Sequence, residues 1–155
     1  MSPELEQLLA FAYSPSAFGK PMKRKVVQLG KKYYWDKIVD NDELLDYWRD
    51  YWQIPIEYNS LLVNIYEKGQ SISPHIDKIN NLVAGSKVFS CSMSIREDEQ
   101  LTKKLGTMKF STGKKVDLFH RTVVAFDPIE HYNKKIKHSA TSCDDRINFT
   151  FRNLE

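Results

Sequence analysis

The sequence predicts a mainly β domain of the α+β class, in which helices in the first third of the chain pack on a β jelly roll. The last two thirds contain many short segments rich in β-branched and aromatic residues, and closely spaced turn residues separate them, which is typical of sandwiches and barrels. The first third contains two stretches in which apolar residues recur with helical spacing. A chain of 155 residues fits one domain with its own hydrophobic core.

Two helices are expected, one near each end of this first third. Ser2 followed by Pro3 and ELEQLL is a typical helix start, with Ser2 as the N-cap and Pro3 in the first turn. A second helix is expected in residues 41–52, and Pro55 ends it. The apolar positions that support these helices are Leu5, Leu8, Leu9 and Ala12, and then Leu44, Leu45, Trp48, Tyr51 and Trp52.

Between the helices, residues 14–22 are rich in Pro, Gly and Ser and predict a loop. KVVQLG and KKYYWDKIV, residues 25–30 and 31–39, predict two strands divided by Gly30. The later strand-like segments are LLVNIY, SISPHID, KVFSCSMSI, GTMKFST, VDLFHRTVVAFD, KKIKHSATS and RINFTFR. Turn residues fall between them at Gly69, Gly85, Gly106, Gly113, Asp127-Pro128 and Asp144-Asp145.

Composition excludes several classes of protein. No stretch approaches the roughly 18 apolar residues of a membrane span, and the N-terminal segment has acids but no basic region of a secretory signal. Cys91 and Cys143 do not occur in a zinc-binding spacing, so we expect free thiols in a reducing compartment. These features predict an intracellular protein of the cytoplasm or nucleus, monomeric and without a membrane partner.

The net charge of +3 is small, but basic residues concentrate in one stretch, from Lys20 to Lys37, where the only acid is Asp36. This stretch also carries Tyr33, Tyr34 and Trp35. A basic segment with aromatic residues can follow a phosphate backbone and stack on bases. A solvated basic surface has the same composition, and the charge alone favours that second interpretation.

The segment SPHID, residues 73–77, contains a histidine and an aspartate with one residue between them. In a strand, His75 and Asp77 would point to the same face. Two ligands on one rigid edge, together with a second histidine, form the 2-His-1-carboxylate face that binds Fe(II) and leaves three coordination positions open. The HxD spacing alone is weak evidence, because two polar side chains on a solvated loop give the same pattern.

Three histidines are candidates for the remaining ligand. His120 lies in LFHRT beside an apolar strand, and His131 follows the turn at Asp127-Pro128. His138 lies in KKIKHSAT, just before the last strand. We choose His138, because that last strand has a second feature that complements a metal site.

That feature is the alternation in RINFTFR, residues 146–152. Arg146, Asn148, Thr150 and Arg152 share one face, and the apolar side chains share the other. An arginine that faces a core is costly unless an anion pairs with it, and a small dicarboxylate would supply two carboxylates for the two arginines. A solvated outer strand face is the alternative, and only the HxD segment favours the dicarboxylate beside an open iron site.

The strand LLVNIY, residues 61–66, alternates in the same way. Asn64 and Tyr66 share a face, so an amide and a phenol are available to hydrogen-bond the carboxylates of a ligand. The same pair can be satisfied by other groups inside a core, and for these two residues alone that interpretation is at least as good.

These motifs, in this order, resemble the AlkB-type 2-oxoglutarate- and iron-dependent dioxygenases. The segment YNSLLVNIYEKGQSISPHID resembles the family pattern FNxxLxNxYxxGxxIxxHxD, and KVFSCSMS resembles the strand that follows it. KHSA resembles the segment with the distal histidine, and RINFTFR the terminal RxNxTFR. The resemblance covers about residues 57–152, with a looser match in KRKVVQLGKKYY.

The resemblance implies a double-stranded β-helix, which agrees with the predicted jelly roll, and a role for each matching residue. The implied Fe(II) ligands are His75, Asp77 and His138, and the implied 2-oxoglutarate-binding residues are Asn64, Tyr66, Arg146, Asn148 and Arg152. Arg146 would pair with the distal carboxylate, and Arg152 would lie closer to iron and substrate. The implied reaction uses O2 to oxidise a methyl group on nitrogen and releases formaldehyde, while 2-oxoglutarate becomes succinate.

The substrate implied by the family is an alkylated base in DNA or RNA, so the expected activity is oxidative demethylation in nucleic-acid repair. Residues 1–56 would then supply the helices and a nucleotide lid, and residues 57–155 the catalytic jelly roll of the same domain. The expected substrate contacts are Lys23, Arg24, Lys25, Tyr33 and Tyr34. Pro74 before His75 resembles the PHxD branch of the family, which leaves a modified tRNA base or a protein side chain as the alternative substrate.

Overall fold

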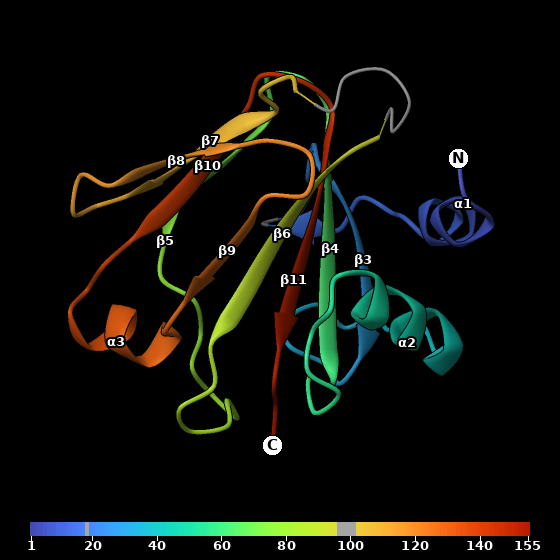
Figure 1. The fold of residues 1–155 in the computed structure, drawn as a ribbon, viewed down its shortest axis with the longest axis horizontal. Helices are drawn as coiled ribbons and strands as arrows, with labels where there is room; N and C mark the ends of the chain where they lie inside the picture. The colour runs from blue at the N-terminus through green and yellow to red at the C-terminus, as the bar shows by residue number, and fades with distance from the viewer. Residues whose placement is uncertain (18, 96–101) are drawn as a thin grey trace.

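The structure, a computed structural model, describes residues 1–17, 19–95 and 102–155. Its strands form two main antiparallel sheets that face each other, as Figure 1 shows. One has five strands in the order β3-β4-β11-β6-β9, and the other has four in the order β5-β10-β7-β8. The predicted jelly roll with N-terminal helices is therefore confirmed.

Several elements follow the predicted segments in the second half of the chain, with two exceptions described below. The five-stranded sheet contains β3 (Lys25–Gly30), β4 (Ser60–Tyr66), β6 (Val88–Ser94), β9 (Val123–Phe126) and β11 (Arg146–Arg152). The four-stranded sheet contains β5 (Ser71–His75), β7 (Gly106–Phe110), β8 (Lys115–Leu118) and β10 (His138–Ser142). The helices are α1 (Pro3–Ala10), α2 (Asp42–Tyr51) and α3 (Pro128–Asn133), and a small hairpin is formed by β1 (Ser16–Ala17) and β2 (Lys20–Pro21).

The two N-terminal helices begin at side-chain caps that the sequence predicts. The Ser2 side chain accepts a hydrogen bond from the backbone N–H of Leu5, and Pro3 occupies the first turn of α1. Asn41 caps α2 in the same way, through the backbone N–H of Leu44. In the described part of the chain, no helix is long and apolar enough to span a membrane.

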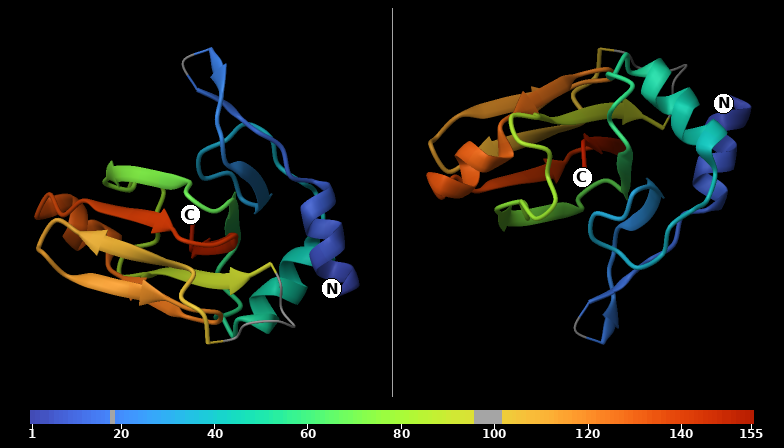
Figure 2. Two further views of the ribbon diagram at one scale, coloured as in Figure 1. Left: turned by 90° about the horizontal axis from the view of Figure 1, so that it is seen from above. Right: turned by 90° about the horizontal axis from the view of Figure 1, so that it is seen from below.

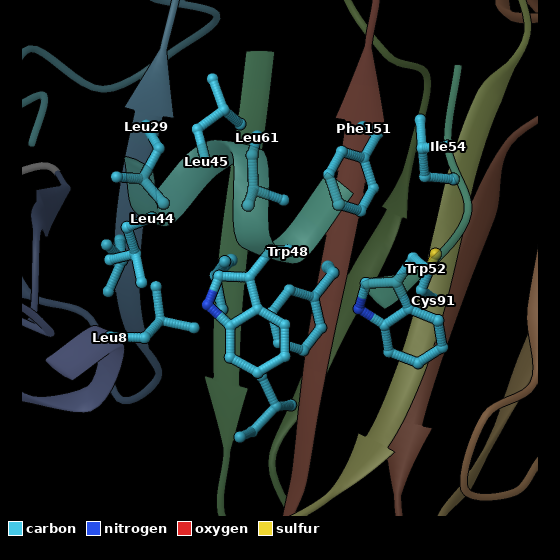
Figure 3. Packing of buried hydrophobic residues seen from close by; sticks show 14 of the residues in the cluster. Leu8, Leu29, Leu44, Leu45, Trp48, Trp52, Ile54, Leu61, Cys91 and Phe151 are labelled. Atoms are coloured by element: carbon cyan, nitrogen blue, oxygen red, sulfur yellow. The ribbon is translucent and has the colours of Figure 1, made fainter. Parts of the chain in front are cut away.

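Helices α1 and α2 cover the outer face of the five-stranded sheet, beside β3 and β4 in the views of Figure 2. Trp48 of α2 is the centre of this layer: its ring lies 4.7 Å from that of Phe149 on β11, and the side chain is almost fully buried. Leu61 and Phe151 lie under the same helix, as Figure 3 shows. The apolar face of the last strand thus packs on helices, which leaves its polar face toward the second sheet.

Residues 31–39 do not form the predicted strand. Gly30 has φ +76°, and a Cβ at this position would lie 2.1 Å from the carbonyl oxygen of Asn59, so the chain turns sharply where β4 begins. Beyond Gly30 the neighbouring strand has ended, and no continuous ladder is possible. Residues 31–38 therefore form a loop, and the chain rejoins β3 only at the isolated bridge between Leu29 and Val39.

Two further segments differ from their predicted form. Residues 116–127, predicted as one strand, form β8 and β9, which belong to different sheets and are joined by a turn in which Arg121 has φ +72°. Residues 128–133 form α3, where a turn was predicted, and β10 begins only at His138. The Asp127 side chain caps α3 by accepting hydrogen bonds from two backbone N–H groups, and Pro128 lies in its first turn. A capping residue followed by proline is the same helix-start pattern that Ser2-Pro3 shows.

Candidate metal centre and its pocket

The polar faces of β4, β6 and β11 meet on the side of the five-stranded sheet that faces the second sheet. In the β11–β4 register, Arg146 lies opposite Tyr66 and Asn148 opposite Asn64. Cross-strand partners project from the same face, so these side chains line one wall. That wall borders a pocket of about 540 Å³, whose lining includes Asn64, Tyr66, His75, Asp77, His138, Arg146, Asn148, Thr150 and Arg152.

The second sheet brings the two distant histidines together. His75 ends β5 and His138 begins β10, and the β10–β5 register places them directly opposite each other. Asp77 follows two residues after the end of β5, in the connecting loop and not in the strand as predicted. Even so, one ligand atom from each of these three residues lies within 4.8 Å of the other two.

The geometry of this triad fits a metal ion. Oδ1 of Asp77 lies 3.5 Å from Nε2 of His75 and 3.3 Å from Nε2 of His138. Two ligands at right angles, each about 2.1 Å from an ion, lie about 3 Å apart, so these separations are close to those of a shared coordination sphere. Nδ1 of His75 lies 2.8 Å from the carbonyl oxygen of Ser73, which accepts a hydrogen bond from Nδ1–H and leaves Nε2 free to coordinate.

The other two candidate histidines lie outside this triad. His120 is in the turn between β8 and β9, where its Nδ1 accepts a hydrogen bond from the backbone N–H of Ser94. His131 lies in α3 with its ring stacked on Phe126 at 4.8 Å. Both have structural contacts, and among the described residues the one group of this kind that the structure brings together is His75, Asp77 and His138.

The carboxyl group of Asp77 is held in its ionised form. Burial opposes its ionisation, but Arg152 and the two imidazoles outweigh burial and hold the pKa of Asp77 well below its usual range. Nη2 of Arg152 donates to Oδ2 of Asp77 at 2.8 Å, while Oδ1 faces the imidazoles. An ionised carboxylate beside two imidazoles is the donor set that Fe(II) takes in a 2-His-1-carboxylate site.

Arg146 lies at the other end of the same wall, at the start of β11. It is 1% exposed, and its described partners are the hydroxyl of Ser142, 3.3 Å from Nε, and the ring of Tyr66, 4.6 Å from Cζ. None of these is an acid, and burial lowers the pKa of Arg146 below its ordinary value. A buried guanidinium with no acidic partner among the described residues is suited to a carboxylate ligand.

Arg152, at the end of β11, has unused donors as well. Its Nε and Nη1 are buried and have no hydrogen-bond partner among the described residues. The ring of Tyr33 covers its guanidinium, with Cζ at 3.6 Å from the ring centroid. Burial is the main reason why the pKa of Tyr33 rises to about 12. The Tyr33 side chain therefore stays a neutral phenol at physiological pH.

Of the remaining predicted cosubstrate residues, the two asparagines are already engaged by protein groups. Asn148 donates to the Ser90 hydroxyl at 2.8 Å and accepts from the Thr150 hydroxyl at 2.6 Å, so both ends of its amide are used. Oδ1 of Asn64 accepts a hydrogen bond from Nε of Arg24 at 2.9 Å. Tyr66 is buried beside Arg146, and burial raises the pKa of its phenol.

The predicted substrate contacts divide into two groups. Arg24, Tyr33 and Tyr34 line the pocket, whereas Lys23 and Lys25 are exposed and lie outside its lining. Arg24 belongs to the basic stretch from Lys20 to Lys37 and is predicted to contact the substrate with it, but its side chain points to Asn64 within the pocket. Residues 23 and 24 precede β3, so strand alternation in the sequence does not predict where the Arg24 side chain points.

Sequence reasoning missed most of the apolar lining and one charged residue. Met108, Leu118 and Phe126 complete the pocket from the second sheet and β9. Lys78, directly after Asp77, also lines the pocket, and its Nζ lies 4.5 Å from the centre of the Tyr34 ring. The sequence shows that Lys78 is next to Asp77, a candidate ligand. It does not show the contact between Lys78 and Tyr34, which are far apart along the chain.

Two solved structures share this arrangement of strands. The structure of OsALKBH1 superposes with a TM-score of 0.59 at 18% sequence identity, over 92% of this chain and 83% of that one. A Pseudomonas putida prolyl-4-hydroxylase superposes with a TM-score of 0.50 at 10% identity, over 97% of this chain and 81% of that one. No family model and no curated protein matches the sequence. The likenesses show that the chain has the jelly-roll fold of these two proteins.

Proposed function

We propose that this protein is an Fe(II)- and 2-oxoglutarate-dependent dioxygenase that demethylates N-alkylated bases in DNA or RNA. One observation carries the proposal: a His75–Asp77–His138 triad and a buried arginine, Arg146, line the same pocket, and the described residues offer this arginine no acidic partner. The triad supplies a metal site with one carboxylate and two imidazoles, and the arginine supplies an anion site. A metal-chelating dicarboxylate satisfies both at once, and 2-oxoglutarate is such a molecule.

Each residue of the wall has a task in this proposal. Arg146 binds the distal carboxylate of 2-oxoglutarate, and the phenol of Tyr66 beside it donates to the same group. Arg152 orients Asp77 through the 2.8 Å hydrogen bond, so that Oδ1 stays aimed at the imidazoles. The chemistry that iron and 2-oxoglutarate supply when bound is oxidation of a C–H bond by O2, with 2-oxoglutarate converted to succinate and CO2.

The apolar and aromatic lining supports an aromatic substrate. Tyr34 and Trp35 line the pocket beside Tyr33, and a base extruded from a nucleic acid stacks on such rings. Met108, Leu118 and Phe126 keep the opposite side free of competing donors and limit the access of water. The motif resemblance to AlkB-type dioxygenases implies the same substrate class.

A panel of substrates tests the proposal. DNA and RNA oligonucleotides with 1-methyladenine or 3-methylcytosine are incubated with the protein, Fe(II) and 2-oxoglutarate, and succinate and the mass of the oligonucleotide are measured. We expect the mass of one methyl group to be lost and succinate to rise above the level without oligonucleotide. Succinate that stays at that background level with every methylated DNA and RNA would rule the repair activity out.

A protein side chain or a modified tRNA base is the second candidate substrate. Pro74 before His75 and the fold shared with a prolyl-4-hydroxylase favour it. Whole tRNA and a methylated peptide therefore belong in the same panel. Turnover on one of these, with none on the simple oligonucleotides, would select this second substrate with the same cofactor chemistry.

The exposed lysines give a prediction about nucleic-acid binding. The double substitution Lys23→Gln and Lys25→Gln is expected to weaken binding and to reduce the slope of log K against log salt by about 1.4 to 1.8, if each lysine neutralises one phosphate. Binding of a fluorescent oligonucleotide at several salt concentrations measures this slope. Lys114→Gln with Lys115→Gln, in the exposed turn at β8, removes the same charge and serves as the control. An equal slope change in both variants would show that the effect is one of net charge.

A further inference from the structure

Gln28 is a buried polar residue that none of the roles above uses. It lies in β3 opposite Leu62 of β4, and it is 1% exposed. Leu62 is a pocket-lining residue, so Gln28 projects from the same face of the sheet. A buried amide is costly unless its donors and its acceptor find partners, which raises the question of what this side chain binds.

The hydrogen-bond partners of the Gln28 side chain all belong to the 31–38 loop. Its Oε1 accepts from the backbone N–H of Tyr33 at 2.8 Å and from that of Tyr34 at 3.2 Å. Its Nε2 donates to the carbonyl oxygen of Trp35 at 2.6 Å, with the carbonyl of Lys37 at 3.5 Å. The amide thus takes the place of the strand ladder that this segment lacks.

The loop that Gln28 holds reaches the candidate metal centre. The ring of Tyr33 covers the guanidinium of Arg152, and the Tyr33 hydroxyl donates to the carbonyl oxygen of Lys78 at 3.1 Å. Arg152 in turn donates to Asp77, which directly precedes Lys78. A continuous chain of contacts therefore runs from Gln28 through Tyr33 and Arg152 to the carboxylate of the triad.

We propose that Gln28 is a positioning residue that fixes the 31–38 loop over Arg152 and Asp77, so that this wall of the pocket exists before any substrate binds. The backbone supports the ends of the loop, since Lys31 donates to Asn59 and Val39 donates to Gln28 itself, both at 2.8 Å. Between those ends, the side chain of Gln28 holds the segment that carries Tyr33 and Trp35. The catalytic consequence rests on the proposed function, whereas the order of the loop does not.

Only glutamine among residues of this size has both functions that the loop needs. Methionine has the same length but neither donor nor acceptor, and it leaves two N–H groups and one carbonyl of the loop without their partner. Glutamate keeps the acceptor, but its second oxygen would face the carbonyl of Trp35. Gln28→Met and Gln28→Glu are therefore expected to release the loop by different amounts, with the larger effect from methionine.

Limited proteolysis measures the release directly, without metal or cosubstrate. The loop contains Lys31, Lys32 and Lys37, all exposed and all trypsin sites. We expect Gln28→Met to accelerate cleavage at these sites at least about tenfold, because cleavage follows the population of the open loop. Gln70→Met is the matched control: Gln70 lies between β4 and β5, and its side chain binds the backbone of Glu67 and Lys23.

Activity separates a positioning role from a merely structural one. In Gln28→Met we expect turnover of the methylated oligonucleotide to fall about tenfold or more, because a small displacement of a binding wall is costly to the reaction. The KM for 2-oxoglutarate should stay within about threefold, because Arg146 lies at the other end of the wall and keeps its contacts. Less demethylated product should form for each succinate.

The outcomes are distinguishable. Unchanged cleavage in a folded Gln28→Met protein, judged by circular dichroism, would overturn the inference. If Gln28→Met does not fold, Tyr33→Leu breaks the same chain one contact later, and an unchanged ratio of product to succinate in that variant would overturn it instead. If no substrate in the panel is turned over, the proposed function fails, and the cleavage rates alone still decide whether Gln28 holds the loop.

Discussion

Asp77→Ala is expected to abolish binding of Fe(II) and all turnover of 2-oxoglutarate. The carboxylate is the one anionic member of the triad, and both imidazole Nε2 atoms lie within 3.5 Å of its Oδ1. Without it, two imidazoles remain beside the guanidinium of Arg152, which repels a cation. Anaerobic titration with Fe(II) and 2-oxoglutarate, followed by the visible charge-transfer band, measures the loss.

The same substitution is expected to lower the free energy of unfolding but not to prevent folding. Breaking a buried ion pair from one side costs about 3 to 5 kcal/mol, because Arg152 then lies buried without its anion. Asp77→Asn keeps the volume and an oxygen for Arg152, so it should lose iron with a smaller loss of stability. Asp117→Ala, an exposed carboxylate paired with Lys104, is the control for both readouts. A normal charge-transfer band in Asp77→Ala would show that the ion binds elsewhere.

The last strand shows what a sequence can predict of a site. Because side chains alternate strictly along a strand, RINFTFR predicts both of its faces, and the structure places the apolar one under the helices and the polar one in the pocket. The same period predicts that Asn64 and Tyr66 share a wall. The sequence alone therefore places Arg146 and Arg152 on one face of the strand.

The proximity of His75 and His138, by contrast, cannot be predicted from alternation along a strand. It depends on the register between β5 and β10, which are far apart in the sequence, and no local pattern sets that register. The choice of His138 over His120 and His131 relied on its proximity to the last strand. The structure explains why proximity was a useful guide: β10 and β11 follow one another and bring the histidine and the arginines to one pocket from two sheets.

The 31–38 loop shows where local patterns mislead. KKYYWDKIV has strand-like composition, but a strand needs a neighbour, and β4 begins at Ser60, opposite Gly30. The side chain of Gln28 then satisfies the backbone groups that a ladder would have used. The sequence places Gln28 in a predicted strand, but the segment that its side chain binds is visible only in three dimensions.

Arg146→Met is expected to raise the 2-oxoglutarate requirement strongly while leaving the protein as stable as before, or more stable. The loss of a buried charge pair with a carboxylate is worth about 2 to 5 kcal/mol, which corresponds to an increase in KM of about 30-fold or more. The folded protein without cosubstrate gains, because a desolvated guanidinium that has no acidic partner among the described residues is replaced by an apolar side chain of similar length. Succinate formation against 2-oxoglutarate concentration measures the KM, and thermal unfolding measures the stability.

Arg152→Met is the matched control for this prediction, because the two arginines share a strand and a face but differ in their partners. Arg152 neutralises Asp77, so its loss is expected to destabilise the protein, whereas loss of Arg146 is not. An unchanged KM in Arg146→Met would mean that the distal carboxylate binds elsewhere. A marked loss of stability in the same variant would mean that Arg146 is part of the core. A raised KM without loss of stability is expected for an arginine that binds a ligand, whereas a loss of stability is expected for an arginine that stabilises the fold.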